Sequence, residues 1–172
     1  MEWQQVLIDS FERVAKGLEE ALAGLSQSDL DKQPNPDCNS MGWLAWHLTR
    51  GQDSAIAWVT GQQQLWIKDN WSTKFNREPN PGDTGFRHKS EDVAAFKSPD
   101  VETLLGYHRA VFERSKEYLG KLTTTELGRE LKNPVMPTVE ALLMAILSDD
   151  LQHVGQIAYL RGLFKGRGWK AV

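Results

Sequence analysis

Four long segments of the chain repeat apolar side chains at three- and four-residue steps, and this period limits the fold more than any other feature. The segments cover residues 3–25, 40–60, 98–120 and 138–162. Such a period places the apolar side chains on one face of a helix, and four helices of this kind bury their faces most economically against one another. No strand-like alternation and no internal repeat occur. We therefore predict an all-α fold, a four-helix bundle, with residues 1–172 as a single domain.

Residues at the segment starts are typical helix caps. Asn39 or Ser40 is expected to cap the second helix and Thr138 the last one, because a side-chain oxygen at that position accepts a bond from a free amide of the first turn. Ser98 is expected to cap the third helix, with Pro99 at its first position, where no amide is needed. These residues set the expected lengths of the helices.

The connection between the second and third helices, residues 62–99, is long and shows no sustained period. It contains too many aromatic residues for a solvated linker: Trp66, Trp71, Phe75, Phe86 and Phe96. We expect this aromatic-rich loop to fold over the bundle, with a short helix from Ser90 to Phe96. At the end of the chain, residues 164–172 are basic and rich in glycine, and Trp169 is a candidate anchor for them.

The composition excludes several classes of function. A net charge of −3 and a pI near 5.8 give no general attraction to nucleic acid or to anionic lipid. No stretch approaches about eighteen uninterrupted apolar residues, and the first residues do not resemble a secretion signal. Cys38 is the only cysteine, so an internal disulfide and a thiolate zinc cluster are excluded. We expect a soluble cytoplasmic protein that acts on a small molecule and binds neither nucleic acid nor membrane.

The stretch 148–159, SDDLQHVGQIAY, places polar side chains in a helix that should be apolar. Asp149 and His153 continue the series of Ile146, so both are expected to point inward. A buried carboxylate needs a cationic partner or a metal ion. Residues four apart lie one above the other on a helix, so Asp149 and His153 can reach one ion.

A third ligand would come from His47, near the start of the second helix. Two imidazoles and one carboxylate suit zinc, nickel or iron, and three protein ligands leave positions for water or substrate. Asp150, three residues before His153, is the alternative carboxylate ligand. It lies further than Asp149 from the helix face that the preceding apolar residues define. The alternative for the whole trio is a buried Asp–His hydrogen bond without an ion, since no diagnostic motif is present.

Other residues are candidates for a pocket or for contacts to the ligands. Trp43 and Trp46 either wall an apolar pocket or fill the core. His88 either is an exposed loop residue or overhangs the site. His108 is either a core histidine bonded to a polar neighbour or a fourth or supporting group, and Gln156 is a further candidate beside the ligands.

Two segments resemble the DinB-like superfamily of bacterial proteins: GWLAWHLTRGQD at 42–53 and DDLQHVGQIAYLRG at 149–162. The loop sequence DTGFRHKSEDVAAF at 83–96 resembles an uncharacterised branch that is common in actinobacteria. The resemblance covers nearly the whole chain. It implies an up-down-down-up bundle with a divalent metal held at the positions of His47, Asp149 and His153. Many relatives have histidine in place of Asp149, whereas the mycothiol-dependent maleylpyruvate isomerases use a carboxylate there.

The resemblance also implies a function. The chain looks like a metal-dependent S-transferase, in which the ion would lower the pKa of an external thiol such as mycothiol or bacillithiol and present the thiolate to an electrophile. With no cysteine expected near the site, the thiol would come from outside. The alternatives are a metal-dependent hydrolase, and a non-catalytic stress or interaction module whose metal is structural or absent. The chain is expected to be too short for the isomerases' extra C-terminal domain. The resemblance therefore gives weaker support for the isomerases' substrate in this protein. Relatives often form homodimers, so a homodimer is expected.

Overall fold

The computed structural model describes residues 2–166, and the regular elements within them are helices. One isolated antiparallel bridge, between Glu130 and Thr138, is the exception among these residues. The prediction of an all-α fold is confirmed for the described residues. Trp169, the candidate anchor of the tail, lies outside the described residues. None of the helices described has the length and apolar character needed to cross a membrane.

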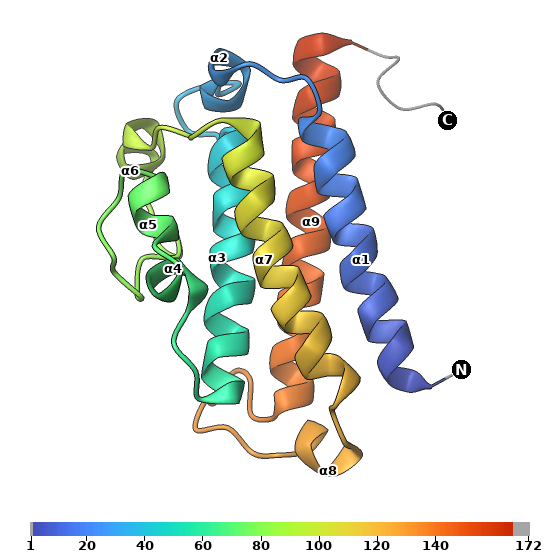
Figure 1. Ribbon diagram of the computed structural model, residues 1–172. Helices are drawn as coiled ribbons and strands as arrows, with labels where there is room; N and C mark the ends of the chain where they lie inside the picture. Colours follow the sequence, from blue (N-terminus) through green and yellow to red (C-terminus); the bar gives the residue numbers. More distant parts are fainter. Residues whose placement is uncertain (1, 167–172) are drawn as a thin grey trace.

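Four long helices form the body of the molecule: α1 (Trp3–Leu22), α3 (Met41–Thr60), α7 (Val101–Gly120) and α9 (Val139–Lys165). Figure 1 shows that α1 rises from the N-terminus, α3 and α7 run in the opposite direction, and α9 rises again. Helices α1 and α3 each pack against both α7 and α9. The candidate ligands His47 on α3 and His153 on α9 therefore lie on two neighbouring helices.

The inward faces of these helices form two clusters of buried apolar residues. Near the end of the bundle that carries α2 and α6, the core includes Leu18, Trp46, Trp66, Tyr107 and Ile157. Toward the other end it includes Phe11, Val14, Ile56, Phe112 and Leu142. Removing one such large side chain from water stabilises the fold by about 1.5–3 kcal/mol.

The predicted caps of α3 and α9 are confirmed. The Ser40 hydroxyl accepts a hydrogen bond from the amide of Trp43, and the Thr138 hydroxyl accepts one from the amide of Ala141. The last helix continues beyond the expected end at Gly162, to Lys165.

The predicted cap of the third helix was wrong. Asp100 caps α7, and its carboxylate accepts a bond from the amide of Thr103. Ser98 is engaged elsewhere, because its amide donates to Asp31 and its hydroxyl donates to the carbonyl of Pro99.

The first helix also ends earlier than expected, at Leu22. A short helix, α2 (Gln27–Asp31), begins in the predicted connection, where Ser26 and Asp29 form a capping box. The other connection, between α7 and α9, contains α8 (Thr124–Leu127).

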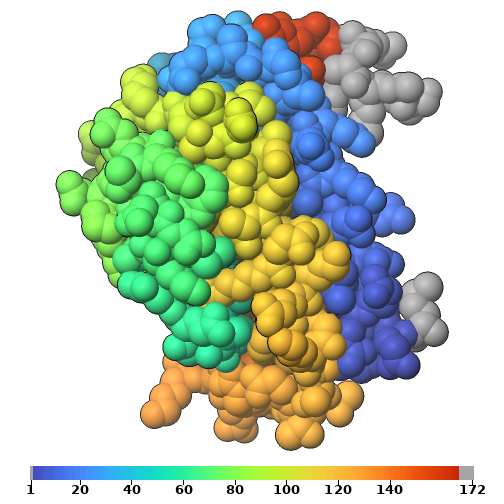
Figure 2. All heavy atoms as spheres, in the orientation of Figure 1, coloured from blue at the N-terminus to red at the C-terminus, as the bar shows by residue number. Residues whose placement is uncertain are grey.

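Residues 62–99 contain three short helices: α4 (Leu65–Lys68), α5 (Trp71–Lys74) and α6 (Ser90–Ala95). The segment forms the flank beside α3 and α7 and is coloured green in the space-filling view (Figure 2). Trp66, Phe75 and Phe96 are buried, whereas Phe86 is 74% exposed. The amides of Leu65 and Trp66 donate to the carboxylate of Asp53, and these bonds tie the start of the segment to α3.

Candidate metal centre

Three potential ligands meet where α3 and α9 lie side by side. His47 projects from α3, and Asp149 and His153 project from successive turns of α9. One ligand atom from each of the three lies within 4.8 Å of the others. The Nε2 atom of His153 is 3.4 Å from Asp149 Oδ1, and the Nε2 atom of His47 is 3.8 Å from Asp149 Oδ2.

The other ring nitrogen of each imidazole, Nδ1, already has a hydrogen-bond partner. His47 Nδ1 donates to the backbone carbonyl of Thr84, and His153 Nδ1 lies 2.8 Å from Gln156 Oε1. Oxygens of this kind only accept hydrogen bonds, so each Nδ1 carries a proton. The lone pair of each neutral ring is then on Nε2, the atom that faces Asp149. Metal-binding histidines in proteins are commonly oriented by such partners.

The distances fit an ion better than a direct Asp–His hydrogen bond. A strong N–H···O bond is about 2.7–3.2 Å long, and both contacts of Asp149 are longer than that. Two ligand atoms at about 2.1 Å from a tetrahedral ion lie about 3.4 Å apart. The two separations from Asp149 are 3.4 and 3.8 Å, and all three ligand atoms lie within 4.8 Å of one another, so the side chains would move closer together around an ion.

The two adjacent acids of α9 face different environments, and one prediction about them was wrong. Asp149 does not point inward: its side chain is 45% exposed, against 15% for His47 and 14% for His153. Asp150 takes the inward position and is 1% exposed. Val139 and Leu142 of the expected series are buried, but Leu147 and Asp150 are buried in place of Ile146 and Asp149, one position later. Asp149 therefore lies at the rim of the site, where solvent and small molecules can reach it.

The three groups shift one another's protonation. Burial lowers the pKa of His47, although the Thr84 carbonyl partly opposes this effect. Burial also lowers the pKa of His153, but the neighbouring Asp149 and Gln156 outweigh it, so the net pKa is raised. Contact with His153 lowers the pKa of Asp149. An incoming cation therefore meets an ionised carboxylate and displaces any proton held by His153.

The wall behind His47 depends on a close approach of the loop. Gly85 has φ +85°, and a Cβ atom there would lie 2.8 Å from His47 Nδ1 and 2.9 Å from the rings of Trp43 and Trp46. On one face, the ring of Trp43 stacks on His47 with centroids 4.7 Å apart. A glycine is required at residue 85 because of both its conformation and its contacts. Neither Thr84 nor Gly85 was identified from the sequence, since a loop has no period that predicts its contacts.

Three further sequence candidates, Trp46, His88 and His108, contact protein groups outside the set of three ligands. Trp46 is fully buried in the core. His88 accepts a bond from Trp43 Nε1 at 3.1 Å and approaches Asp83 Oδ1 at 3.2 Å, so it connects the loop to the indole that supports His47. His108 is 2% exposed and lies 3.2 Å from the hydroxyl of Thr49.

The interpretation of His108 as a core histidine bonded to a polar neighbour agrees with these contacts. Burial lowers its pKa to about 4. His108 is not part of the group formed by His47, Asp149 and His153.

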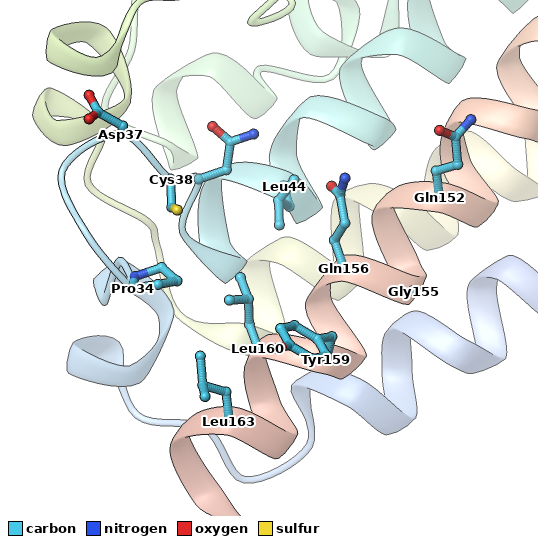
Figure 3. Close-up of a pocket in the computed structure, with 11 residues that line it drawn as sticks. Pro34, Asp37, Cys38, Leu44, Gln152, Gly155, Gln156, Tyr159, Leu160 and Leu163 are labelled. Carbon is cyan, nitrogen blue, oxygen red and sulfur yellow. The ribbon is translucent and has the colours of Figure 1, made fainter.

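Two hollows are lined by residues of α9, and only the first of them is lined by any of the three ligands. The first, of about 400 Å³, is lined by two of the ligands and by apolar side chains, including His47, Asp149, Trp58, Phe86, Met136 and Ile146. The second, of about 770 Å³, lies on the Gln156 side (Figure 3) and is lined by residues that include Cys38, Leu44, Gln152, Gln156, Tyr159 and Leu163. Neither Trp43 nor Trp46 lines either hollow, so the expected indole wall does not form there.

A sequence profile of the DinB superfamily matches residues 10–157. The chain belongs to the DinB superfamily. This DinB-superfamily protein is also similar to a solved structure titled "Crystal structure of the conserved protein of locus from Enterococcus faecalis". The two are 27% identical with a TM-score of 0.88, and the match covers 97% of this chain and 99% of that chain. No curated protein matches the sequence significantly.

Proposed function

We propose that this DinB-superfamily protein is a metal-dependent enzyme that transfers a low-molecular-weight thiol to an electrophile. A divalent ion, zinc or nickel before iron, is held by His47, Asp149 and His153 between two helices of an up-down-down-up bundle. The observation that carries the proposal is the convergence of three ligand atoms within 4.8 Å, with both Nδ1 positions already bonded elsewhere. When bound, the ion supplies a positive charge that lowers the pKa of a thiol.

The chain's own residues prepare the site for this chemistry. Thr84 and Gln156 hold the two imidazoles with Nε2 toward Asp149. Asp149 supplies one negative charge, which balances half of the charge of a divalent cation. Because its side chain is 45% exposed, the site stays open on the side from which a thiol or water arrives.

The two hollows support an uncharged, largely apolar electrophile. Their volumes, about 400 and 770 Å³, lie in the range of pockets that hold small molecules. Neither hollow is lined by lysine or arginine, so neither offers a cationic partner for a carboxylate or phosphate. Amides at Gln152 and Gln156 offer hydrogen bonds near the ligands.

The source of the thiol needs a direct test, because the chain's own cysteine lines one of the two hollows. Cys38 lines the larger hollow together with Gln156, although it is not part of the metal-binding group. If the thiol is external, Cys38→Ala retains conjugating activity and still requires added mycothiol or bacillithiol. Loss of activity in this variant would assign the nucleophile to the protein itself.

Hydrolysis is the second candidate, and the exposure of Asp149 favours it too, since water reaches the same side of the ion. A purely structural metal is the third. Structural zinc sites are closed by four protein ligands, whereas three such side chains gather within residues 2–166. Product analysis of metal-loaded protein, with and without thiol, separates transfer from hydrolysis. Turnover of neither kind across a panel of electrophiles would leave the structural role.

The ligand assignment is tested with His153→Ala. We expect this variant to lose bound metal with little loss of helicity, because one of three ligands is removed from a partly exposed position. Elemental analysis and far-UV circular dichroism measure the two effects. Gln152→Ala is the matched control, because Gln152 is exposed one residue away and bonds to Ser148. Unchanged metal stoichiometry in His153→Ala would reject the site.

A further inference from the structure

Arg50 lies one helical turn after His47 on α3, and its side chain is fully buried. Three of its N–H groups donate to backbone carbonyls of the loop between α5 and α6. Nε donates to Asp83 at 3.1 Å, and Nη2 donates to Asn80 at 3.3 Å and to Pro81 at 3.2 Å. A single side chain thus holds a short stretch of loop that has no regular secondary structure.

The remaining donors of Arg50, on Nη1, bind acceptors outside residues 80–84. Nη1 donates to Gln64 Oε1 at 2.8 Å and to the Tyr107 hydroxyl at 3.3 Å, and it lies 3.7 Å from Asp53 Oδ2. The guanidinium carbon lies 4.7 Å from the ring centroid of Trp66. All five donors of the planar group have acceptors, so the group cannot move relative to the loop without breaking hydrogen bonds.

The next carbonyl in the loop belongs to the metal centre. Arg50 holds the carbonyl of Asp83, and the carbonyl of Thr84, one residue later, accepts the Nδ1 proton of His47. Gly85 then packs against the His47 ring. Two residues one turn apart on α3 therefore bind two consecutive carbonyls of the same loop.

We propose that Arg50 is a positioning residue for the metal centre. It holds residues 80–84 so that the Thr84 carbonyl keeps the His47 proton on Nδ1 and leaves Nε2 free for an ion. Without this support the loop moves away from His47, Nδ1 loses its acceptor, and the tautomer with the proton on Nε2 becomes populated. That tautomer cannot bind the ion through Nε2. The proposal rests on the proposed metal site, but the tautomer can be measured without metal.

The test compares Arg50→Lys with Arg114→Lys in the full chain. Lysine keeps the charge near Asp53 but has three donors on one atom and cannot span three carbonyls. Arg114 is the matched control: it approaches the same carboxylate, at 3.5 Å, but it donates to the Gln63 carbonyl and the Thr60 hydroxyl. We expect Arg50→Lys to weaken zinc binding about 10- to 100-fold, the range found when a group that orients a metal ligand is lost.

The second readout is the protonation pattern of His47 in metal-free protein. The chain has four histidines, so ¹⁵N-labelled imidazoles can be assigned by substitution. We expect His47 to carry its proton on Nδ1 in the native chain and in Arg114→Lys, and to show a mixture of tautomers in Arg50→Lys. Circular dichroism should be unchanged in both variants.

A native tautomer of His47 in Arg50→Lys, with zinc affinity within twofold of the native value, would overturn the proposal. If the native chain binds no zinc, the proposed function fails. The tautomer comparison still tests whether Arg50 positions the loop against His47. Should Arg50→Lys not fold, insertion of one glycine after the exposed Gly82 breaks the register of the loop and leaves α3 intact. This insertion should produce the same tautomer mixture, and a native tautomer there would also overturn the proposal.

Discussion

Asp53 on α3 and Asp150 on α9 are equally buried, at 0% and 1% exposure, but they differ completely in their partners. Asp53 accepts hydrogen bonds from the amides of Leu65 and Trp66 at 3.0 and 2.9 Å, and from the Tyr107 hydroxyl at 2.8 Å. Neither oxygen of Asp150 has a hydrogen-bond partner within residues 2–166. Burial alone therefore does not define the role of an acid in this bundle.

The partners of Asp53 give it a structural role, whereas Asp149 and Asp150 lie at or beside the candidate metal site. Asp53 joins three parts of the molecule, namely α3, α7 and the segment 62–99, and it also supports Arg50. Burial raises the pKa of Asp150 well above its ordinary value, with a smaller contribution from the charge of Asp149. Because burial disfavours its charged form, Asp150 is a weaker cation ligand than the half-exposed Asp149.

Removing Asp53 should have the largest effect on stability. Asp53→Ala leaves Arg50 buried without its counter-ion and removes the anchor of residues 65 and 66. Breaking a buried ion pair in this way costs about 3–5 kcal/mol. Urea unfolding followed by tryptophan fluorescence measures the change.

Asp69→Asn provides the control for that measurement. Asp69 is an exposed acid at the end of α4, and a surface substitution of this kind changes stability by about 0.5 kcal/mol or less. Equal losses in the two variants would show that the partners of Asp53 do not stabilise the fold.

The same comparison shows which features were predictable from sequence. The caps Ser40 and Thr138 were predictable because capping involves only neighbouring residues in the chain. The orientation of α9 was not, since adjacent apolar pairs such as Leu142-Leu143 and Ile146-Leu147 give this helix two overlapping apolar series. Packing against α1 and α3 selects between the series, and it turns Asp150 inward and Asp149 to the rim.

The candidate ligands were proposed by residue chemistry and resemblance, but their supporting contacts were not. His47, Asp149 and His153 follow from the helical spacing together with the family pattern. The contacts of Thr84 with His47, and of Arg50 with the loop, join residues 30 or more positions apart along the chain. No periodicity in residues 62–99 indicates which carbonyl will face α3, so these contacts required the structure.

His108 offers a second comparison with the fully paired Asp53, with a smaller and pH-dependent effect. Its Nε2 atom has no hydrogen-bond partner within the described residues, and burial lowers its pKa from 6.5 to about 4. The unfolded chain therefore binds a proton at a higher pH than the folded chain does. Stability should be full above about pH 6.5 and should fall as the pH drops toward 4, by at most about 3 kcal/mol.

His108→Gln keeps a polar group that can bond to Thr49 but cannot take up this proton. We expect the variant to lose stability less steeply than the native chain between pH 6.5 and 4. Urea midpoints measured across that range, in metal-free buffer, check the prediction. Parallel curves for the two proteins would show that His108 is not the group responsible.

The smallest expected effect concerns Asp150 itself. Asp150→Leu replaces a buried, unpaired carboxyl group with an apolar side chain, and removing unpaired buried polar atoms should raise stability by about 1 kcal/mol. Asp150→Asn retains a buried polar group and should give no such gain. Metal content should stay native in both variants, because Asp149 and not Asp150 faces His47 and His153. Loss of metal in both variants would reverse the comparison, since it would show that the buried acid rotates toward the site and acts as the ligand.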